Sequence, residues 1–189
     1  MSEAVDTNKE IVNMTNETKI HDTEHDEEAV QYLTFKLDGE SFATEISKVR
    51  EVLEYTQVTP VPRSPEFMQG VINLRGSVVP VVDLRLQFGM SAAEQTVDTC
   101  IIIIEVNIEG TSTVLGALAD SVQEVIDLKP EQLEPAPSFG TRVDNNFVQH
   151  MGKLEDRFVI VLDMNKVFSL EQTNMVEQTG AENNNTEAA

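Results

Sequence analysis

The sequence is poor in several residue types, and each shortage excludes something. Its 189 residues include one cysteine, Cys100, and no tryptophan. A single cysteine excludes an internal disulfide, and its place in the apolar run 100–104 favours a small buried hydrophobe. No apolar run approaches the roughly eighteen residues that a membrane-spanning helix needs. The N-terminus also lacks the basic and apolar regions of a signal peptide. We therefore expect a soluble, cytoplasmic protein without membrane insertion.

Basic residues are scarce as well. The chain has 13 Lys and Arg against 33 Asp and Glu, a formal net charge of −20. This sign argues against nucleic-acid binding, which requires cations that neutralise phosphates, and against docking on anionic lipid. Residues 1–30 hold a net charge of −7 and residues 171–189 a net charge of −4, with little periodic apolar content in either. We predict that both are disordered tails around a folded region, 31–170.

Motifs of catalysis and of cofactor binding are missing. The sequence has no Gly-x-Gly-x-x-Gly loop, no P-loop, no cysteine pair and no Gly-x-Ser-x-Gly elbow. The folded region has one histidine, His150, which is more typical of a solvated loop than of a catalytic site. The segment His21–His25 has the His-x-x-Glu-His form of an inverted zinc-protease motif, but its polar flanks offer no apolar face, so we interpret it as a coincidence. We expect no enzyme activity, no metal and no cofactor.

Short strands dominate the folded region. Leu33, Phe35 and Leu37 alternate with polar residues, the period of a half-buried strand, and Asp38-Gly39 is a tight-turn signal. Further strands are predicted at 71–74, 78–82, 100–108, 114–118, 122–128 and 158–162. Single helical turns are predicted at 64–67, where a serine precedes a proline, and after Asp83 and Asp163. Many strands and few helices predict an all-β barrel class.

The folded region contains an internal repeat. Three pairs of segments match in the same order along the chain: 49–54 with 122–127, 60–62 with 135–137, and 81–84 with 161–164. The offset between the copies only grows, as loop insertions in the second copy would make it. We infer two similar barrels, 31–95 and 96–170, each near the lower size limit for an independent core. The two should pack together and leave a groove between them, and such grooves are favoured binding sites.

Several repeated residues have two interpretations. Asp83 and Asp163 follow strands and precede short helices, so they are predicted to cap helix N-termini. Glu51 recurs as Glu124, whereas Arg75, at a predicted hairpin tip, has Glu155 as its counterpart. Because the scaffold should require a residue in both copies, it does not explain Arg75, which is either an ordinary solvated arginine or a contact residue.

Two pairs of valines recur in the same way. Val49 and Val52 match Val122 and Val125. Core packing is one interpretation. Partial exposure in the groove between the barrels, where an apolar slot would accept a partner helix, is the other.

These segments resemble a known family. Val49-x-Glu-Val52, Thr59-Pro-Val-Pro62 and above all Gly70-Val-Ile-Asn-Leu-Arg-Gly-Ser-Val-Val-Pro-Val-Val-Asp-Leu84 resemble CheW-like adaptor domains of bacterial chemotaxis. The likeness covers about residues 30–170. It implies two SH3-like five-stranded β-barrels with short helices, somewhat interleaved, so that the first strand can pair with the second barrel.

The resemblance also implies a function. CheW-like adaptors bind the cytoplasmic hairpin tips of methyl-accepting chemotaxis receptors and the regulatory domain of the histidine kinase CheA, and catalyse nothing. By position, the residues that fall where such adaptors place interaction residues are Ile46, Val49, Glu51, Gly70, Arg75, Val122 and Val125. The resemblance assigns the valines to the receptor helix, and Glu51 and Arg75 to polar contacts with receptor or kinase. The two tails depart from the common pattern of the family.

Relatives and other classes are separated by length and chemistry. A CheV-type protein adds a receiver domain, and a CheA fragment needs phosphotransfer and ATP-binding domains, so the length favours a stand-alone adaptor located at membrane-associated receptor arrays. A scaffold of a paralogous chemosensory pathway, for pili or biofilm, is the alternative. A barrel enzyme lacks its catalytic residues here, and a nucleic-acid-binding barrel conflicts with the net charge of −9 in 31–170.

Overall fold

The computed structural model of the protein describes residues 28–138 and 140–169. The two predicted tails therefore lie outside the described residues, except for 28–30, and so does the histidine motif at 21–25. Within the described part, no helix is long and apolar enough to cross a membrane.

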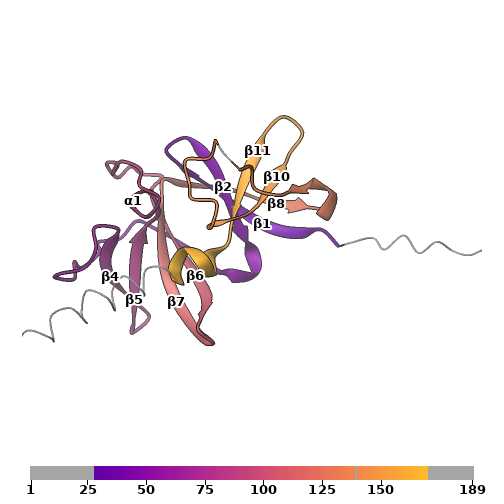
Figure 1. Ribbon diagram of the computed structural model, residues 1–189. Coiled ribbons are helices and arrows are strands. Elements are labelled where there is room, and N and C mark those ends of the chain that lie inside the picture. Colours follow the sequence, from indigo (N-terminus) through magenta and orange to yellow (C-terminus); the bar gives the residue numbers. More distant parts are fainter. Residues whose placement is uncertain (1–27, 139, 170–189) are drawn as a thin grey trace, which may run out of the picture.

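Two β-sheets build the structure. The first has the strand order β8 (Ser121–Leu128), β1 (Val30–Leu37), β2 (Glu40–Glu45), β11 (Phe158–Leu162), β10 (Val148–Lys153) and β9 (Leu133–Glu134). The second has the order β3 (Val49–Glu54), β6 (Cys100–Ile108), β7 (Thr111–Ala119), β5 (Ser77–Asp83) and β4 (Met68–Leu74). Figure 1 shows them as two lobes, with β4, β5 and β7 in one and β8, β10 and β11 in the other. The all-β fold of two SH3-like units is confirmed, although within the described residues neither sheet closes its edge strands onto each other.

The two sheets share one topology, but the chain enters them in an exchanged order. In the first sheet the hairpin β1–β2 lies between β8 and β11, and in the second the hairpin β6–β7 lies between β3 and β5. The bond between hairpin and last strand is parallel in both, β2 with β11 and β7 with β5. Each sequence copy therefore gives its first hairpin to the sheet built by the other copy. The predicted boundary between two barrels at residues 95 and 96 stays a prediction. It does not separate the two sheets, because each sheet contains strands from both sides of it.

Tight turns close three of the hairpins. At Asp38-Gly39, Arg75-Gly76 and Glu109-Gly110 both residues have positive φ, between 50° and 88°. Two successive positive φ angles define the type I′ turn, whose twist matches that of the flanking strands. Glycine takes the second position without steric cost, which explains why each turn ends in glycine.

Three apolar clusters hold the sheets. One lies inside the second sheet, around Val81, Ile101 and Ile103, and another inside the first, around Leu128, Val159 and Val161. The third and largest draws from both sheets, including Phe35 and Phe42 from one and Ile102 and Ile104 from the other. The alternation along β6 explains this division, because successive isoleucines point to opposite faces of the sheet. The largest cluster therefore fills the space between the sheets.

Short helical segments join the strands. Helix α1 (Leu84–Gln87) begins after Asp83, whose Oδ1 accepts from the backbone N–H groups of Arg85 and Leu86. Residues 164–169 are helical as well, and the Asp163 carboxylate accepts from two backbone N–H groups there. Both predicted caps are confirmed. Two 3₁₀ turns, η1 (Ile46–Lys48) and η2 (Pro130–Gln132), are further short helical segments in the described part.

The helical turn predicted at 64–67 is wrong. The chain makes a single reverse turn there, in which the Met68 N–H donates to the Pro65 carbonyl at 3.0 Å, and β4 starts at Met68. Pairing with β5 begins at Met68 itself, where it lies opposite Val82. The ladder with β5 therefore takes the backbone that a longer helix would need.

Candidate functional site

A bulge in β8 places two of the predicted contact valines on one face. Residues three apart in a regular strand point to opposite faces. Here Val122 lies opposite Phe35 and Val125 opposite Leu33, with a register shift between them. Directly opposed residues share a face, and Phe35 and Leu33 both point into the central cluster. Thr34 fixes the bulge, since its hydroxyl donates to the Glu124 carbonyl at 2.8 Å and accepts from the Glu124 N–H at 3.1 Å.

The same bulge recurs in β3. Val49 lies opposite Ile104 and Val52 opposite Ile102, with a register shift between Val49 and Glu51. Ile102 and Ile104 both belong to the central cluster, so Val49 and Val52 share its face. The sequence repeat is therefore also a repeat of backbone geometry.

The bulges bring an apolar rim to the surface at the edge of the central cluster. We call this rim the valine rim: Ile46, Val49, Val52, Val122 and Val125. Ile46, Val49 and Val122 are partly buried against the cluster, whereas Val52 and Val125 are 41% and 48% exposed. Each valine pair thus has one packed and one exposed member, so both interpretations of the pairs hold in part. A filled core lies between the sheets, with the exposed valines at its edge, and the predicted groove stays a prediction.

Glu51 and Arg75 form a bidentate ion pair. Arg75 Nη1 and Nη2 each donate to one Glu51 carboxylate oxygen at 2.9 Å. Arg75 lies in the β4–β5 turn and its side chain is 78% exposed, while that of Glu51 is 24% exposed. The structure thus brings together two residues that the sequence predicted separately. An exposed pair of this kind contributes only about 0–1 kcal/mol to stability.

An equivalent ion pair exists in the other sheet. Arg157 Nη2 donates to Glu124 Oε1 at 2.6 Å. Arg157 lies in the turn between β10 and β11, directly before β11 and two positions after Glu155, the counterpart of Arg75. The aligned counterpart of Arg75 is Glu155, but an arginine two positions later still reaches the equivalent glutamate, so the repeat contains a similar ion pair that the alignment does not show.

A surface pocket adjoins each pair. The one beside Glu51 and Arg75 has a volume of about 600 Å³ and includes Val78 and Val114 in its lining. The one beside Glu124 and Arg157 has a volume of about 480 Å³ and includes Ile126. The two sheets therefore offer similar hollows at equivalent ends.

Gly70 has a backbone function in the structure. It is buried, its φ is 139°, and a Cβ built there would stand 2.0 Å from the Thr59 carbonyl oxygen. Thr59 and Val71, the residue after Gly70, exchange two backbone hydrogen bonds of 2.9 Å. Gly70 thus lets the segment before Pro60 lie directly against β4. Its role in partner contact stays a prediction.

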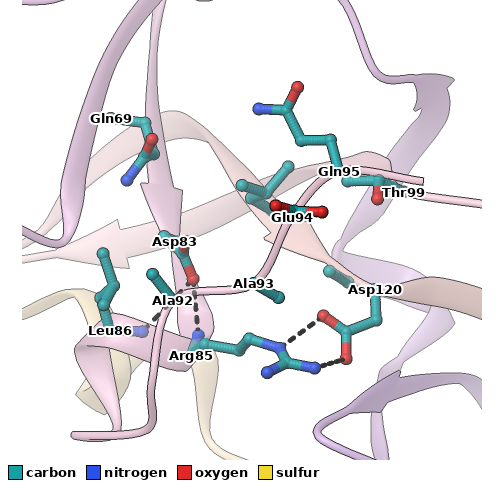
Figure 2. Close-up of a pocket in the computed structure, with 12 residues that line it drawn as sticks. Gln69, Asp83, Arg85, Leu86, Ala92, Ala93, Glu94, Gln95, Thr99 and Asp120 are labelled. Carbon is teal, nitrogen blue, oxygen red and sulfur yellow. Dashed lines mark hydrogen bonds and ion pairs between the residues drawn. The ribbon is translucent and has the colours of Figure 1, made fainter.

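A charged network that sequence reasoning missed lies beside α1. Arg85 Nε and Nη2 donate to the two Asp120 carboxylate oxygens at 2.7 and 2.6 Å, as Figure 2 shows. Hydrogen bonding to Asp120 is the largest influence that raises the pKa of Arg85. Burial raises the pKa of the neighbouring Asp83 carboxyl, against the backbone N–H groups that lower it. Arg85 and Asp120 are both present in the sequence, but no local pattern links two positions 35 residues apart.

Groups suited to other chemistry are few in the described part of the chain. It contains no cluster of three or more His, Cys, Asp or Glu side chains that could hold a metal ion. Cys100 is buried in β6, and burial raises the pKa of its thiol to about 11. His150 lies in β10 at a position equivalent to Gly70, opposite Val161 as Gly70 is opposite Val81.

Comparison with known proteins agrees with this arrangement. Residues 31–172 match the family model of the CheW-like domain. The chain is 33% identical over 147 residues to the chemotaxis protein CheW of Klebsiella aerogenes, which covers 78% of this chain and 86% of that protein. It is also 33% identical over 142 residues to the chemotaxis protein CheW of Rhizobium meliloti, covering 75% and 89%.

A solved structure extends the likeness to the fold. The scaffolding protein TtCheW from Thermoanaerobacter tengcongensis is 34% identical and superposes with a TM-score of 0.67, over 74% of this chain and 92% of that one. On the family model, the relatives and the shared fold, the chain belongs to the family of CheW-like chemotaxis scaffold domains.

Proposed function

We propose that this protein is a chemotaxis adaptor that couples methyl-accepting chemoreceptors to the histidine kinase CheA. It does so by protein–protein binding and performs no catalysis. The observation that supports this best is the valine rim, where two equivalent bulges expose Val52 and Val125 beside partly buried apolar neighbours. An apolar edge of this kind suits one face of an amphipathic helix, which docks through residues spaced three and four apart.

The contact residues divide by chemistry. Ile46, Val49, Val122 and Val125 are assigned to the helical cytoplasmic tip of the receptor. Glu51 and Arg75 are assigned to polar contacts with receptor or kinase, since the exposed arginine fork keeps donor capacity beyond its two bonds to Glu51. Gly70 is assigned to support of the β4 backbone. The protein acts in the cytoplasm at membrane-associated receptor arrays, with no nucleic-acid partner and no insertion into the membrane.

The alternative pathway is less well supported. A CheW-like scaffold in a paralogous system, for pili or biofilm, would use the same surfaces. The relatives described above are named as chemotaxis proteins, which favours the chemotaxis assignment.

The test is a charge placed on the valine rim. Val125→Asp puts a carboxylate where an apolar partner would bury it, and desolvation of an unpaired charge opposes binding. We expect the affinity for a purified receptor-tip fragment to fall at least about tenfold, which corresponds to about 1.4 kcal/mol. Calorimetric titration measures it, and circular dichroism checks the fold.

Val97→Asp is the matched control. Val97 is 98% exposed, lies in the loop before β6 and is not one of the rim residues. Its replacement should leave the affinity within twofold. Equal losses for both variants, or a wild-type protein that binds neither the receptor fragment nor the kinase, would reject the proposal.

A further inference from the structure

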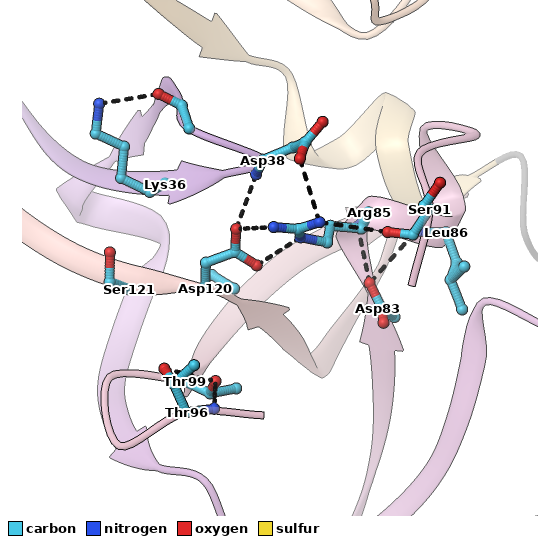
Figure 3. A network of polar contacts seen from close by, with 12 residues as sticks. Lys36, Asp38, Asp83, Arg85, Leu86, Ser91, Thr96, Thr99, Asp120 and Ser121 are labelled. Atoms are coloured by element: carbon cyan, nitrogen blue, oxygen red, sulfur yellow. Dashed lines mark hydrogen bonds and ion pairs between the residues drawn. The ribbon is translucent and has the colours of Figure 1, made fainter. Parts of the chain in front are cut away.

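In the described part, the chain crosses between the sheets twice: from β2 to β3 through Ile46–Lys48, and from β7 to β8 at a single residue, Asp120. Strand β7 of the second sheet ends at Ala119, and β8 of the first begins at Ser121. Asp120 is held on both sides of this crossing. Its two carboxylate oxygens accept from Arg85 of α1, and Oδ2 also accepts from the backbone N–H of Asp38 at 2.8 Å. Figure 3 shows these bonds converging on the one carboxylate.

Further contacts tie the surrounding segments together. The Asp120 backbone N–H donates to the Lys36 carbonyl at 3.1 Å. Arg85 Nη1 lies 3.5 Å from Asp38 Oδ1, and Arg142 Nη1 donates to Asp38 Oδ2 at 2.7 Å. We call the residues Arg85, Asp120, Asp38 and Arg142 the crossing clamp. It joins α1, the β7–β8 junction, the β1–β2 turn and the loop before β10.

The clamp supplies a constraint that the apolar core does not. Burial of apolar surface is non-directional, so the clamp adds directional bonds to the packing of the central cluster. A bidentate guanidinium–carboxylate pair fixes angle as well as distance. The side chains of Arg85 and Asp120 are only 16% and 28% exposed, so solvent screens this pair less than it screens the ion pairs at the hairpins.

We propose that Arg85 is a positioning residue for partner docking, because it fixes where β8 begins relative to the second sheet. Val122 lies two residues after Asp120, and Val49 stands on the second sheet. The clamp therefore sets the spacing between the two halves of the valine rim. This inference rests on the proposed function for its binding readout, whereas its structural readout is independent of any partner.

Removal of Arg85 should displace the start of β8. The carboxylates of Asp38 and Asp120 would then lie near each other, with Arg142 as the remaining cation of the clamp. Two neighbouring negative charges repel each other. The backbone bond from Asp38 to Asp120 would weaken with them. Lysine at position 85 keeps the charge but lacks the planar fork, so it should restore the position only in part.

The experiment combines orientation and affinity. Residual dipolar couplings of backbone amides report whether both sheets share one orientation, and titration with the receptor-tip fragment reports binding. For Arg85→Gln we expect each sheet to fit its own geometry while a common orientation fails, with β8 deviating most, and affinity to fall about tenfold. Arg85→Lys should lose about threefold. Lys166→Gln, which removes an exposed pair with Asp163, is the control and should change neither readout.

The contrary outcomes contradict either the positioning role of Arg85 or the proposed function. A common orientation retained in Arg85→Gln, with affinity within twofold, overturns the positioning role. Lost affinity with an unchanged orientation also overturns it, because Arg85 would then act in some other way. If Arg85→Gln does not fold, the same two measurements on Arg85→Lys give the decision. If the wild-type protein does not bind the receptor fragment, the proposed function is wrong. The residual dipolar couplings alone then test whether Arg85 fixes the orientation of the sheets.

Discussion

The two sheets of this protein share one topology but have different residues at several equivalent positions. Both have a hairpin between a bulged strand and a parallel partner, both have an aspartate cap after the last strand, and both have a glutamate that reaches an arginine of a hairpin. The arginine comes from a two-residue tight turn in one sheet and from the end of a longer turn, directly before β11, in the other. The position of Gly70 is taken by His150 in the second copy. The recurring features belong to the shared fold, whereas the placement of the two arginines and the exchange of Gly70 for His150 distinguish the two ends.

A substitution at Gly70 should give the largest difference in stability between equivalent positions of the two sheets. Gly70→Ala places a Cβ 2.0 Å from the Thr59 carbonyl oxygen at a φ of 139°. Steric overlap and backbone strain should together cost about 2–5 kcal/mol in the free energy of unfolding. Urea denaturation measures it.

The counterpart gives the control for that change. His150→Ala, at the same place in the ladder, should cost less than about 1.5 kcal/mol because no backbone approaches so closely there. Gly39→Ala separates strain from overlap, since its φ is 80° and nothing lies within 4 Å of the added carbon. Equal losses at positions 70 and 150 would show that the two ladders are alike after all.

The helix caps should differ less. Asp83 is buried and Asp163 is partly exposed, although both accept two backbone N–H groups. Asp83→Ala should cost about 1–2 kcal/mol and Asp163→Ala about 0.5–1 kcal/mol, because water replaces the lost acceptor more easily at the exposed site. Thermal and urea unfolding of the two variants give the comparison.

The pH dependence of the Asp83 cap sharpens this comparison. Burial raises the pKa of Asp83 above its ordinary value of 3.8, so the folded state holds more of this proton than the unfolded state does. The stability that Asp83 contributes therefore falls as pH rises from 3.8 through the raised folded value. Asparagine keeps the cap without the charge, so the stability of Asp83→Asn relative to wild type should rise over that window and then level off. A flat difference would contradict the assignment.

The two ion pairs should differ least in stability and most in binding. Arg75→Glu and Arg157→Glu each place a carboxylate near a glutamate at an exposed site, so each should cost less than about 1 kcal/mol. If Arg75 contacts a partner, Arg75→Glu should weaken binding to receptor or kinase about tenfold, and Arg157→Glu should weaken it less than about twofold. Unfolding of the Arg75 variant, seen by circular dichroism, would show that Arg75 is structural.

Local signals in the sequence were enough for much of the fold. The alternation at Leu33–Leu37, the Asp-Gly turn and the aspartate caps each depend on neighbours within a few residues, and the structure has all three. The repeat gave the two equivalent units because matched segments kept their order. The turn at 64–67 misled because its serine and proline also begin helices, and the pairing of β4 decided the outcome.

The site depended on contacts that no local pattern shows. The valines were predicted, but the bulges that bring Val122 and Val125 to one face break the alternation rule from which a strand is predicted. The bond between Arg85 and Asp120 joins residues that only the folded chain brings together. The pair Glu124–Arg157 was hidden because the arginine does not align with Arg75, although each arginine reaches the equivalent glutamate.

The exchange of hairpins between the sheets bears on how this architecture can be taken apart. A chain cut near residue 96 leaves β1 and β2 without β8 and β11, and β6 and β7 without β3 and β5. Neither fragment is a self-sufficient module, and each is the complement of the other, as in a dimer of two interlocked subunits fused end to end. Transplanting one half between relatives would therefore graft two partial sheets, so the unit that can be inherited or engineered is the pair.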